Sequence, residues 1–303
     1  MSLPFWCSIE VKERAIHIDV MQPRQSIPVA LTIAGSDNSA GAGAQADLKT
    51  FTALGVYGLT AITCVVAEVP GKVSAIAPVP PEIVAEQIRL SFGAYPVGAV
   101  KTGMLHSRAI IEAVCAALEH AFLQNPSESP RPALVVDPVM IATSGASLLE
   151  PDGIAAYRNR LFPLATLVTP NLDEVAVLLG RSVSTVEEMR VAGRELCERF
   201  GSAFFVKGGH LHGEAIDLLA TPGSDLVEFA AARVKGVATH GTGCTASGAI
   251  TAGLACGLEL PDAVARAKEF VSRAIRDHFR WTRPDGGETH ALNHSKSGIK
   301  NSP

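Results

Sequence analysis

The stretch Val29-Ala-Leu-Thr-Ile-Ala34, followed by Gly35-Ser-Asp37, decides the fold. An unbroken apolar run that stops at a glycine is typical of a strand covered on both faces. After the next loop, apolar side chains recur every three to four positions from Ala44 to Leu54, which predicts a helix with one buried face. The chain therefore opens as a strand, a loop and a helix.

The same alternation continues along the sequence. Strands alternating with helices imply βαβ units, so we expect one α/β domain with a central, mostly parallel sheet flanked by helices on both faces. Runs at 215–220 and 226–231 around Thr221-Pro-Gly-Ser-Asp225 predict an antiparallel hairpin. The other strands are expected at 59–66, 97–101, 133–136, 167–169 and 203–207, and the other helices at 80–92, 107–121, 152–161, 172–179, 186–200, 245–256 and 261–279.

The two ends of the chain differ from this pattern. Residues 1–26 read as an N-terminal extension, residues 27–282 as the single domain, and residues 283–303 as a polar tail without fixed structure. The polar, Pro-rich segment 124–132 is expected to be a surface loop inside the domain.

Composition favours an intracellular protein that acts on a small molecule. Lys and Arg number 26 against 30 Asp and Glu, a net charge of −4, with no basic block to neutralise a nucleic acid backbone. The six cysteines are scattered without a C-x-x-C pair, which excludes a disulfide framework or a zinc cluster. Charges at residues 10–14 interrupt any signal peptide, and no apolar run reaches about 18 residues. We therefore expect a cytoplasmic chain with no membrane or nucleic acid partner.

The segment Thr239-His-Gly-Thr-Gly-Cys-Thr245 runs directly into a predicted helix. A glycine-containing turn at a helix start presents unpaired N–H groups and the positive end of the helix dipole, which together favour a phosphate or a transferring phosphoryl group. Cys244 lies in the first turn, where its thiol pKa is expected to fall, so it could accept a proton from a substrate hydroxyl. An ordinary turn followed by a buried, inert cysteine is the alternative.

Two further segments place charged groups after strands. Asn171-Leu-Asp-Glu174 brings carboxylates, and Lys207-Gly-Gly-His210 brings a cation, to the edge of the sheet where ligands bind in open α/β folds. A lysine, a carboxylate able to hold Mg²⁺ and an anion-binding turn are the components of phosphoryl transfer. Solvated side chains at strand ends are the simpler explanation of each one alone.

Other known motifs fit less well. Gly41-Ala-Gly-Ala-Gln-Ala46 matches the dinucleotide pattern, with Glu68 at the expected distance, but residues 35–40 separate it from the strand. The P-loop pattern G-x-x-x-x-G-K-[ST] does not occur. His240 with Cys244 could suggest a hydrolase, although catalytic partners generally meet in space rather than in sequence.

Seven pieces of the chain between Val29 and Ala274 resemble the hydroxymethylpyrimidine and phosphomethylpyrimidine kinases of thiamine biosynthesis, within the ribokinase-like superfamily. They occur in the family's order. The pieces are Ala30-Leu-Thr-Ile-Ala-Gly-Ser-Asp37, Gly41-Ala-Gly-Ala-Gln-Ala-Asp-Leu-Lys-Thr-Phe51, Lys101-Thr-Gly-Met-Leu105, Val136-Asp-Pro-Val-Met140, Thr169-Pro-Asn171 with Glu174, Lys207-Gly-Gly-His210 and His240-Gly-Thr-Gly-Cys-Thr245.

The resemblance implies a ribokinase-like fold, a homodimer, and a kinase that uses ATP and Mg²⁺ to phosphorylate the hydroxymethyl group of an aminopyrimidine and then its monophosphate. It also implies that Asp47 and Glu68 hydrogen-bond the amino and ring-nitrogen edge of the pyrimidine, and that Cys244 replaces the Asp base of the wider superfamily. The implied site comprises Gly35, Ala42, Asp47, Glu68, Met104 and Val139 around the pyrimidine, Gly241, Thr242, Gly243 and Cys244 as the anion hole, Asn171, Lys207 and Thr242 on the nucleotide, and Glu174 and Asp137 toward the metal, Asp137 through water.

The chain departs from the family pattern on the substrate side. Val69-Pro-Gly-Lys-Val73 replaces the usual Asn-Thr and Gly-Val pairs, and Pro70 removes a backbone donor there. Asn38 and Ala40 replace the usual Pro and Gly. A pyridoxal kinase is therefore the alternative activity, and a non-catalytic pyrimidine or nucleotide sensor is an alternative of another class.

Overall fold

The computed structural model describes residues 27–124, 130–140, 148–209, 215–234, 237 and 240–295. The extension expected over residues 1–26, the last part of the expected tail and His210 lie outside the described residues.

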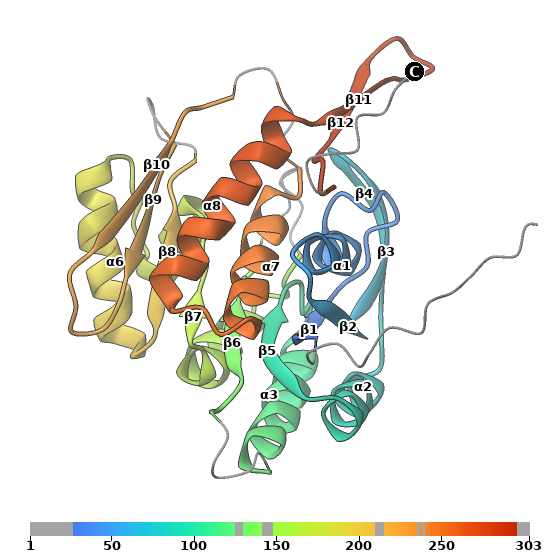
Figure 1. Cartoon of the computed structure of the whole chain (residues 1–303). Helices are drawn as coiled ribbons and strands as arrows, with labels where there is room; N and C mark the ends of the chain where they lie inside the picture. Colours follow the sequence, from blue (N-terminus) through green and yellow to red (C-terminus); the bar gives the residue numbers. More distant parts are fainter. Residues whose placement is uncertain are drawn as a thin grey trace, which may run out of the picture.

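An eight-stranded sheet runs through the molecule in the order β10-β9-β8-β7-β6-β5-β1-β2 (Figure 1). The strands from β2 to β8 in this order are parallel, and β9 and β10 complete the sheet as the expected antiparallel hairpin. Chain order reverses at β1, which lies between β2 and β5, so a ligand crevice is expected at the carboxyl ends of β1 and β5. The strands are β1 Val29–Ala34, β2 Tyr57–Ile62, β5 Val97–Thr102, β6 Ala133–Val136, β7 Leu167–Val168, β8 Ala203–Lys207, β9 Ala215–Ala220 and β10 Val227–Ala231.

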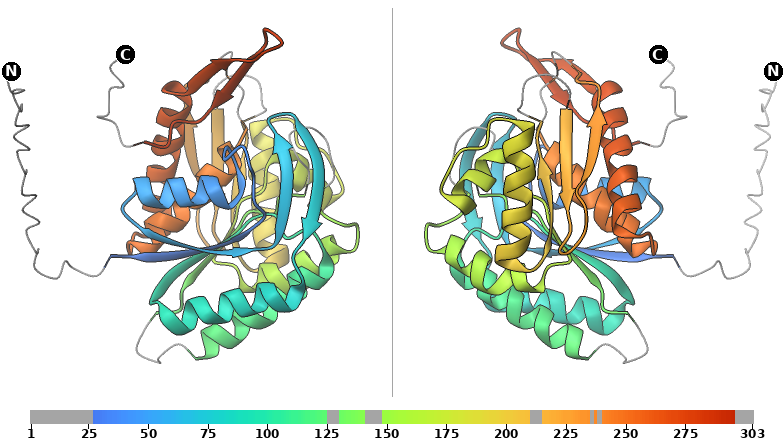
Figure 2. Two further views of the ribbon diagram at one scale, coloured as in Figure 1. Left: turned by 90° about the vertical axis from the view of Figure 1, so that its right-hand side faces the viewer. Right: turned by 90° about the vertical axis from the view of Figure 1, so that its left-hand side faces the viewer.

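Helices cover both faces of this sheet (Figure 2). In β6, Leu134 and Val136 pack in the core on one face, whereas Val135 packs on the other, because successive strand residues point to opposite sides. The predicted doubly covered sheet is thus confirmed. Helices α1 Gly43–Ala53, α7 Thr242–Ala255 and α8 Leu260–Arg276 cover one face, and α2 Pro81–Ala94, α3 Arg108–Leu123, α4 Gly153–Ala156, α5 Leu172–Leu179 and α6 Val186–Phe200 cover the other.

We expected the apolar run 59–66 to form one strand, but the structure divides it between two strands. β2 ends at Ile62, and β3 (Cys64–Val69) pairs antiparallel with β4 (Lys72–Pro78) in a separate two-stranded sheet. We call this β3–β4 unit the lid hairpin. The hydrophobic pattern does not change where the chain leaves one sheet for another, so periodicity alone could not locate the break.

The expectation of an unstructured tail from residue 283 is wrong for residues 283–295. β11 (Phe279–Thr282) pairs with β12 (Glu288–Ala291), and the segment that follows returns to the core. Leu292 and His294 are only 3% and 6% exposed. The many polar residues of this region belong to a tight turn and to buried hydrogen bonds, so composition gave the wrong expectation.

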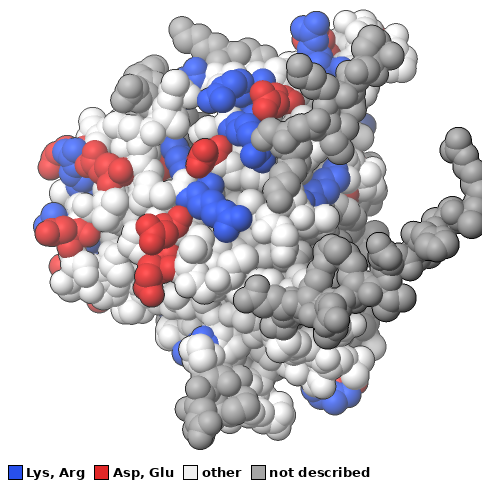
Figure 3. All heavy atoms as spheres, in the orientation of Figure 1, with Lys and Arg blue, Asp and Glu red and all other residues white. Residues whose placement is uncertain are grey.

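Charge is mixed on the face shown in Figure 3, where basic and acidic side chains lie next to one another. Along α8, for example, Lys268 is followed by Glu269. Among the described residues, no helix combines the length and apolar character needed to span a bilayer.

Candidate active site

A buried carboxylate organises the loop that follows β1. The side chain of Asp37 accepts hydrogen bonds from the backbone N–H groups of Ser39, Gly41 and Ala42 at 2.7, 3.1 and 2.7 Å. Its Oδ2 also lies 3.2 Å from Nε2 of His240. Burial opposes ionisation, but the hydrogen bonds from His240 and the amides outweigh it and hold the pKa of Asp37 below its usual range. Asp37 therefore ties the loop that carries Ala42 to the residue that precedes the glycine turn.

The glycine turn opens a helix, as predicted, although the helix begins three residues earlier than expected. Gly241 is the N-cap of α7 in the left-handed conformation, with φ of +84°. The N–H groups of Gly243 and Cys244 consequently fall in the first turn, ahead of the helix's own carbonyl acceptors. A Cβ at Gly241 would lie 1.8 Å from the carbonyl oxygen of Gly41, so only glycine lets the two loops touch.

Lys207 reaches this turn from the end of β8. Its Nζ donates to Oδ1 of Asp137 at 2.9 Å, and a Cβ at Gly243 would lie only 3.3 Å from the same Nζ. The other carboxylate oxygen of Asp137 accepts from Ser247 Oγ of α7 at 3.1 Å. Burial would raise the pKa of Asp137, but the nearby Lys207 and Lys101 hold it below its usual value. The structure thus brings Asp137, Lys207 and the anion turn together, at the carboxyl ends of β6 and β8.

Asn171 and Glu174 form a capping box at the start of α5. Asn171 Oδ1 accepts from the Glu174 N–H, and Glu174 Oε2 accepts from the Asn171 N–H, both at 2.9 Å. Oε1 of Glu174 also accepts from the N–H of Met140 at 3.2 Å. Burial raises the pKa of Glu174 to about 7, assisted by the charge of Asp137, while Lys207 opposes the rise. The motif Asn-x-x-Glu is a capping signal in the sequence, which the functional interpretation of these residues did not use.

Two neighbouring carboxylates suit Mg²⁺, which is usually held by one or two protein carboxylates together with substrate phosphates and water. A cation beside Glu174 would favour its ionised form, against the burial that raises its pKa. Asp137 and Glu174 therefore fit the expected metal side of the site.

The thiol of Cys244 does not have the lowered pKa that its position predicted. Burial raises the pKa of Cys244 to about 11, and the positive charge of Lys101 only partly offsets this effect. The Gly43 amide also interacts with the thiol. The expected fall in the pKa of Cys244 is not seen, because burial outweighs the helix start.

Asp47 faces inward, contrary to the expectation that it meets the pyrimidine. Its side chain is fully buried in an ion pair with Lys101 of β5, and its Oδ2 accepts from Thr32 Oγ1 at 2.7 Å. Burial lowers the pKa of Lys101, but Asp47 more than compensates and raises it to about 12. No role for Lys101 was predicted from the sequence, although its charge also acts on Cys244 and Asp137. A lysine near the end of an otherwise apolar strand was the feature that could have indicated a buried ion pair.

The remaining substrate-side residues gather at the ends of β1 and β5, under the lid hairpin. A Cβ at Gly35 would lie 2.7 Å from Sγ of Cys64 and 3.5 Å from Sδ of Met104. Met104 and Cys64 share a small apolar cluster with the lid, and Val139 packs against that cluster. Glu68 lies on β3, where burial and the charge of Asp37 raise its pKa. Gly35, Met104, Val139 and Glu68 therefore lie at the ends of β1, β5 and β6 and on the lid hairpin, next to the switch point of the sheet.

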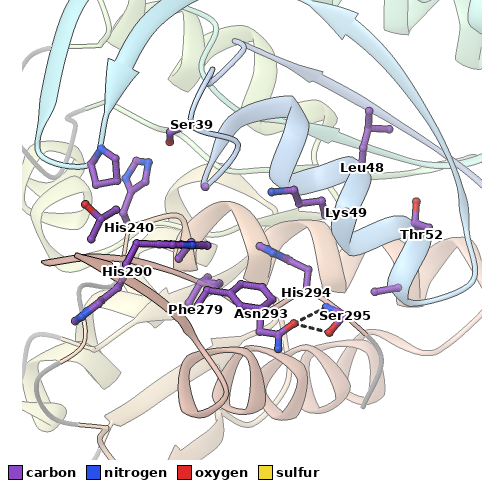
Figure 4. Close-up of a pocket in the computed structure, with 17 residues that line it drawn as sticks. Ser39, Leu48, Lys49, Thr52, His240, Phe279, His290, Asn293, His294 and Ser295 are labelled. Atoms are coloured by element: carbon purple, nitrogen blue, oxygen red, sulfur yellow. Dashed lines mark hydrogen bonds between the residues drawn. The ribbon is translucent and has the colours of Figure 1, made fainter. Parts of the chain in front are cut away.

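A cavity of about 840 Å³ lies elsewhere, between α1 and the segment that follows α8. Figure 4 shows Lys49 of α1 on one side of it and His290, Asn293 and His294 on the other. Ser39, Gly41, Pro70 and His240 line the part of it that lies nearest the site. The charged groups converge at the anion turn instead, which makes that turn the candidate active site.

Comparison with known proteins agrees with this geometry. The phosphomethylpyrimidine kinase family model matches residues 37–288. A hydroxymethylpyrimidine/phosphomethylpyrimidine kinase of Rhizobium meliloti is 45% identical over 248 residues, 82% of this chain and 90% of the relative. A thiamine biosynthesis bifunctional protein of Geobacter sulfurreducens is 44% identical over 89% of this chain, and the chain spans about half (53%) of that relative's length.

Solved structures share the fold. Pyridoxal kinase of Staphylococcus aureus in complex with AMP-PCP and pyridoxal matches with a TM-score of 0.78 and 32% identity, covering 91% of this chain and 96% of that one. Pyridoxal kinase of Bacillus subtilis, an ADP complex, matches with 0.77 and 35% identity over 89% and 98% of the two chains. Phosphomethylpyrimidine kinase of Clostridium difficile matches with 0.70 and 38% identity over 82% and 99%.

Proposed function

The chain belongs to the phosphomethylpyrimidine kinase family, a family of phosphotransferases, and from that premise we propose that it phosphorylates the hydroxymethyl group of 4-amino-5-hydroxymethyl-2-methylpyrimidine and then the resulting monophosphate. ATP is the phosphoryl donor. The observation that carries the proposal is the convergence of Lys207, Asp137 and the amides of the Gly241–Cys244 turn.

The proposed reaction is an in-line displacement. The substrate hydroxyl oxygen forms a bond to the γ-phosphorus, and the bond from that phosphorus to the bridging oxygen of ADP breaks. The Gly241–Cys244 amides and Lys207 stabilise the charge on the phosphoryl oxygens. Most of the catalysis is therefore positioning and electrostatic stabilisation.

Cys244 acts in this scheme as a protonated thiol. With a pKa of about 11 it is not an effective base near neutral pH, so we propose that it orients the substrate hydroxyl by hydrogen bonding. The hydroxyl proton passes to a phosphoryl oxygen and then to water. Because the transition state of phosphoryl transfer is loose, the attacking hydroxyl needs little general base assistance.

Substrate and cofactor groups are assigned by position. Gly35, Ala42, Glu68, Met104 and Val139 contact the pyrimidine, with Glu68 facing its polar edge. Asn171 and Thr242 contact the nucleotide. Asp137 and Glu174 would hold Mg²⁺, which neutralises phosphate charge when bound.

A pyridoxal kinase activity is the second candidate. It is favoured by the similarity to the pyridoxal kinases of Staphylococcus aureus and Bacillus subtilis and by Pro70 at the tip of the lid hairpin. The discriminating experiment is a coupled assay of ADP release with hydroxymethylpyrimidine, its monophosphate and pyridoxal side by side. We expect turnover of both pyrimidines to exceed that of pyridoxal. Turnover of pyridoxal alone would select the second candidate, and activity on none of the three would refute the kinase.

We further propose a cytoplasmic homodimer. The five described cysteines are free thiols, which fits a reducing compartment. The outer face of the lid hairpin is apolar and exposed, with Val65 and Val69 at 58% and 52%. Exposed apolar patches commonly mark interfaces, and a second copy of the chain would cover this one.

A further inference from the structure

The segment that follows β12 inserts a histidine behind the anion turn. His294 is 6% exposed, and its Nε2 lies 2.9 Å from Oγ1 of Thr245, a fully buried residue in the first turn of α7. Thr245 follows Cys244 directly. The contact therefore joins the end of the described chain to the turn that forms the anion site.

The segment is fixed on three sides. The N–H of Asn293 donates to the carbonyl of Ala274 on α8 at 3.1 Å, and the ring of His294 lies 6.4 Å from that of Phe270 on the same helix. Leu292 is buried beside it. Across the cavity of Figure 4, Lys49 of α1 faces the His294 ring. His294 thus sits between α1, α7 and α8, with little freedom to turn.

The hydrogen bonds define which ring nitrogen carries the proton. His294 also bonds the backbone of Leu292, an interaction that favours the ring N–H. A neutral imidazole has a single N–H, and we assign it to Nδ1, toward Leu292, which leaves Nε2 as the acceptor. Burial and the charge of Lys49 keep the ring neutral by lowering its pKa to about 4. Thr245 Oγ1 therefore donates to His294 Nε2.

We propose that His294 is a positioning residue for phosphoryl transfer, holding Thr245 so that the adjacent Gly241–Cys244 amides point at the transferring group. The backbone of Thr245 is already held by its N–H bond to the Gly241 carbonyl at 2.9 Å. His294 holds the side chain as well, which gives the first turn of α7 a second anchor. Oriented donors are effective only when they are held in place before the reaction, which gives this contact a catalytic consequence. The inference rests on the proposed kinase activity.

The activity test uses His294→Leu, His294→Gln and Thr245→Val in the full chain. We expect H294L to lower kcat by about tenfold, within the range for outer partners that orient a site, with the KM for the pyrimidine changed less than about twofold. H294Q restores most of kcat because its amide oxygen can replace Nε2 as acceptor. T245V should lower kcat by a similar factor. Because both substitutions break the same hydrogen bond, adding H294L to T245V should lower kcat little further, which a double-mutant cycle measures.

A matched control is Ser295→Ala, since the exposed Ser295 side chain bonds only Asn293 among the described contacts. Its kcat should equal that of the unaltered protein. Multiplicative losses in the double mutant, or a T245V enzyme with unaltered kcat, would overturn the proposal. If H294L fails to fold, H294Q and T245V decide the question by the same criteria.

A second readout does not depend on activity. In the unaltered protein, ¹⁵N NMR should show His294 as the neutral tautomer protonated at Nδ1 at pH 7, with the Nε2 resonance shifted in T245V. An Nε2 resonance that is the same in T245V and in the unaltered protein would refute the contact. The correct tautomer in a chain that phosphorylates no acceptor would instead refute the proposed function and leave the contact standing.

Discussion

Cys244 shows how two local effects compete at a single residue. The helix start and Lys101 favour a thiolate, whereas burial favours the thiol, and burial prevails to give a pKa of about 11. The residue type and its position were readable in the sequence, but its burial was not, because burial depends on α1 and β5 packing around it.

The first prediction follows from this protonated thiol. Between pH 7 and 9, well below a pKa of about 11, the fraction of thiolate stays small and kcat should not depend on the ionisation of Cys244. Cys244→Ala should lower kcat by about tenfold, the effect of losing one hydrogen bond. The measurement is kcat against pH for both proteins, with Cys256→Ala, an exposed thiol at the other end of α7, as the control. A tenfold rise in kcat per pH unit that disappears in C244A would instead establish a thiolate base.

The second prediction concerns the buried pair of Lys101 and Asp47. Lys101→Met keeps the volume but leaves the Asp47 carboxylate buried without its cation, so we expect a loss of about 3–5 kcal/mol in the free energy of unfolding. Because the pKa of Lys101 is raised to about 12, the lysine keeps its charge near neutral pH, and its contribution is lost as pH rises through that pKa. Burial raises the pKa of Asp47, so the pair is also lost in acid, where that carboxylate becomes neutral. Urea unfolding measures the effect.

The control for that pair is Arg108→Met, which breaks the exposed ion pair with Glu112 and should cost less than about 1 kcal/mol. The double variant K101M with Asp47→Asn should recover part of the lost stability, since neither residue of this pair then carries a buried charge. Equal effects of K101M and R108M would contradict the buried pair.

At the scale of elements, the strands and helices of the main sheet were predictable because their hydrophobic periods are long and clear. The ends of the elements were less predictable. Helix α7 begins at Thr242 rather than Thr245, because residues 241–244 have no apolar repeat that would indicate the helix start. The lid hairpin was missed because β3 continues the apolar run of β2. Sequence reports which segments are apolar, but not which sheet receives them.

The third prediction tests the start of α7. Gly241→Ala adds a Cβ 1.8 Å from the Gly41 carbonyl oxygen at a φ of +84°, so the anion turn must move and kcat should fall by about 10²–10³-fold. Gly257→Ala is the matched control, because Gly257 has a φ of +81° with nothing within 4 Å of the added Cβ. It should cost about 1–2 kcal/mol of stability and leave kcat unchanged. A G241A enzyme with near-normal kcat would remove the turn from the mechanism.

On the scale of the whole molecule, the predicted α/β domain and its mostly parallel sheet are confirmed, and most predicted site residues meet at its carboxyl edge. Two errors have one physical origin. The resemblance placed Asp47 on the substrate, and polar composition placed residues 283–295 in solvent, yet Asp47 and His294 are buried with partners that lie far away in sequence, Lys101 for Asp47 and Thr245 for His294. The sequence does not show that such a polar residue is buried, because its burial depends on a partner far away in the chain.

The last prediction tests the proposed homodimer. The outer face of the lid hairpin pairs Val65 with Ala77 and Ala67 with Ala75, an apolar surface on a two-stranded sheet that is marginally stable by itself. Val65→Glu should weaken the dimer by at least about tenfold, because a charge cannot be desolvated there without a partner. Sedimentation velocity over a range of concentrations measures the dissociation constant. Leu123→Glu is the control, since Leu123 is 85% exposed at the end of α3, away from the lid hairpin, and should leave the dimer intact. A monomeric unaltered protein, or equal dimerisation of V65E and L123E, would exclude this face as the interface.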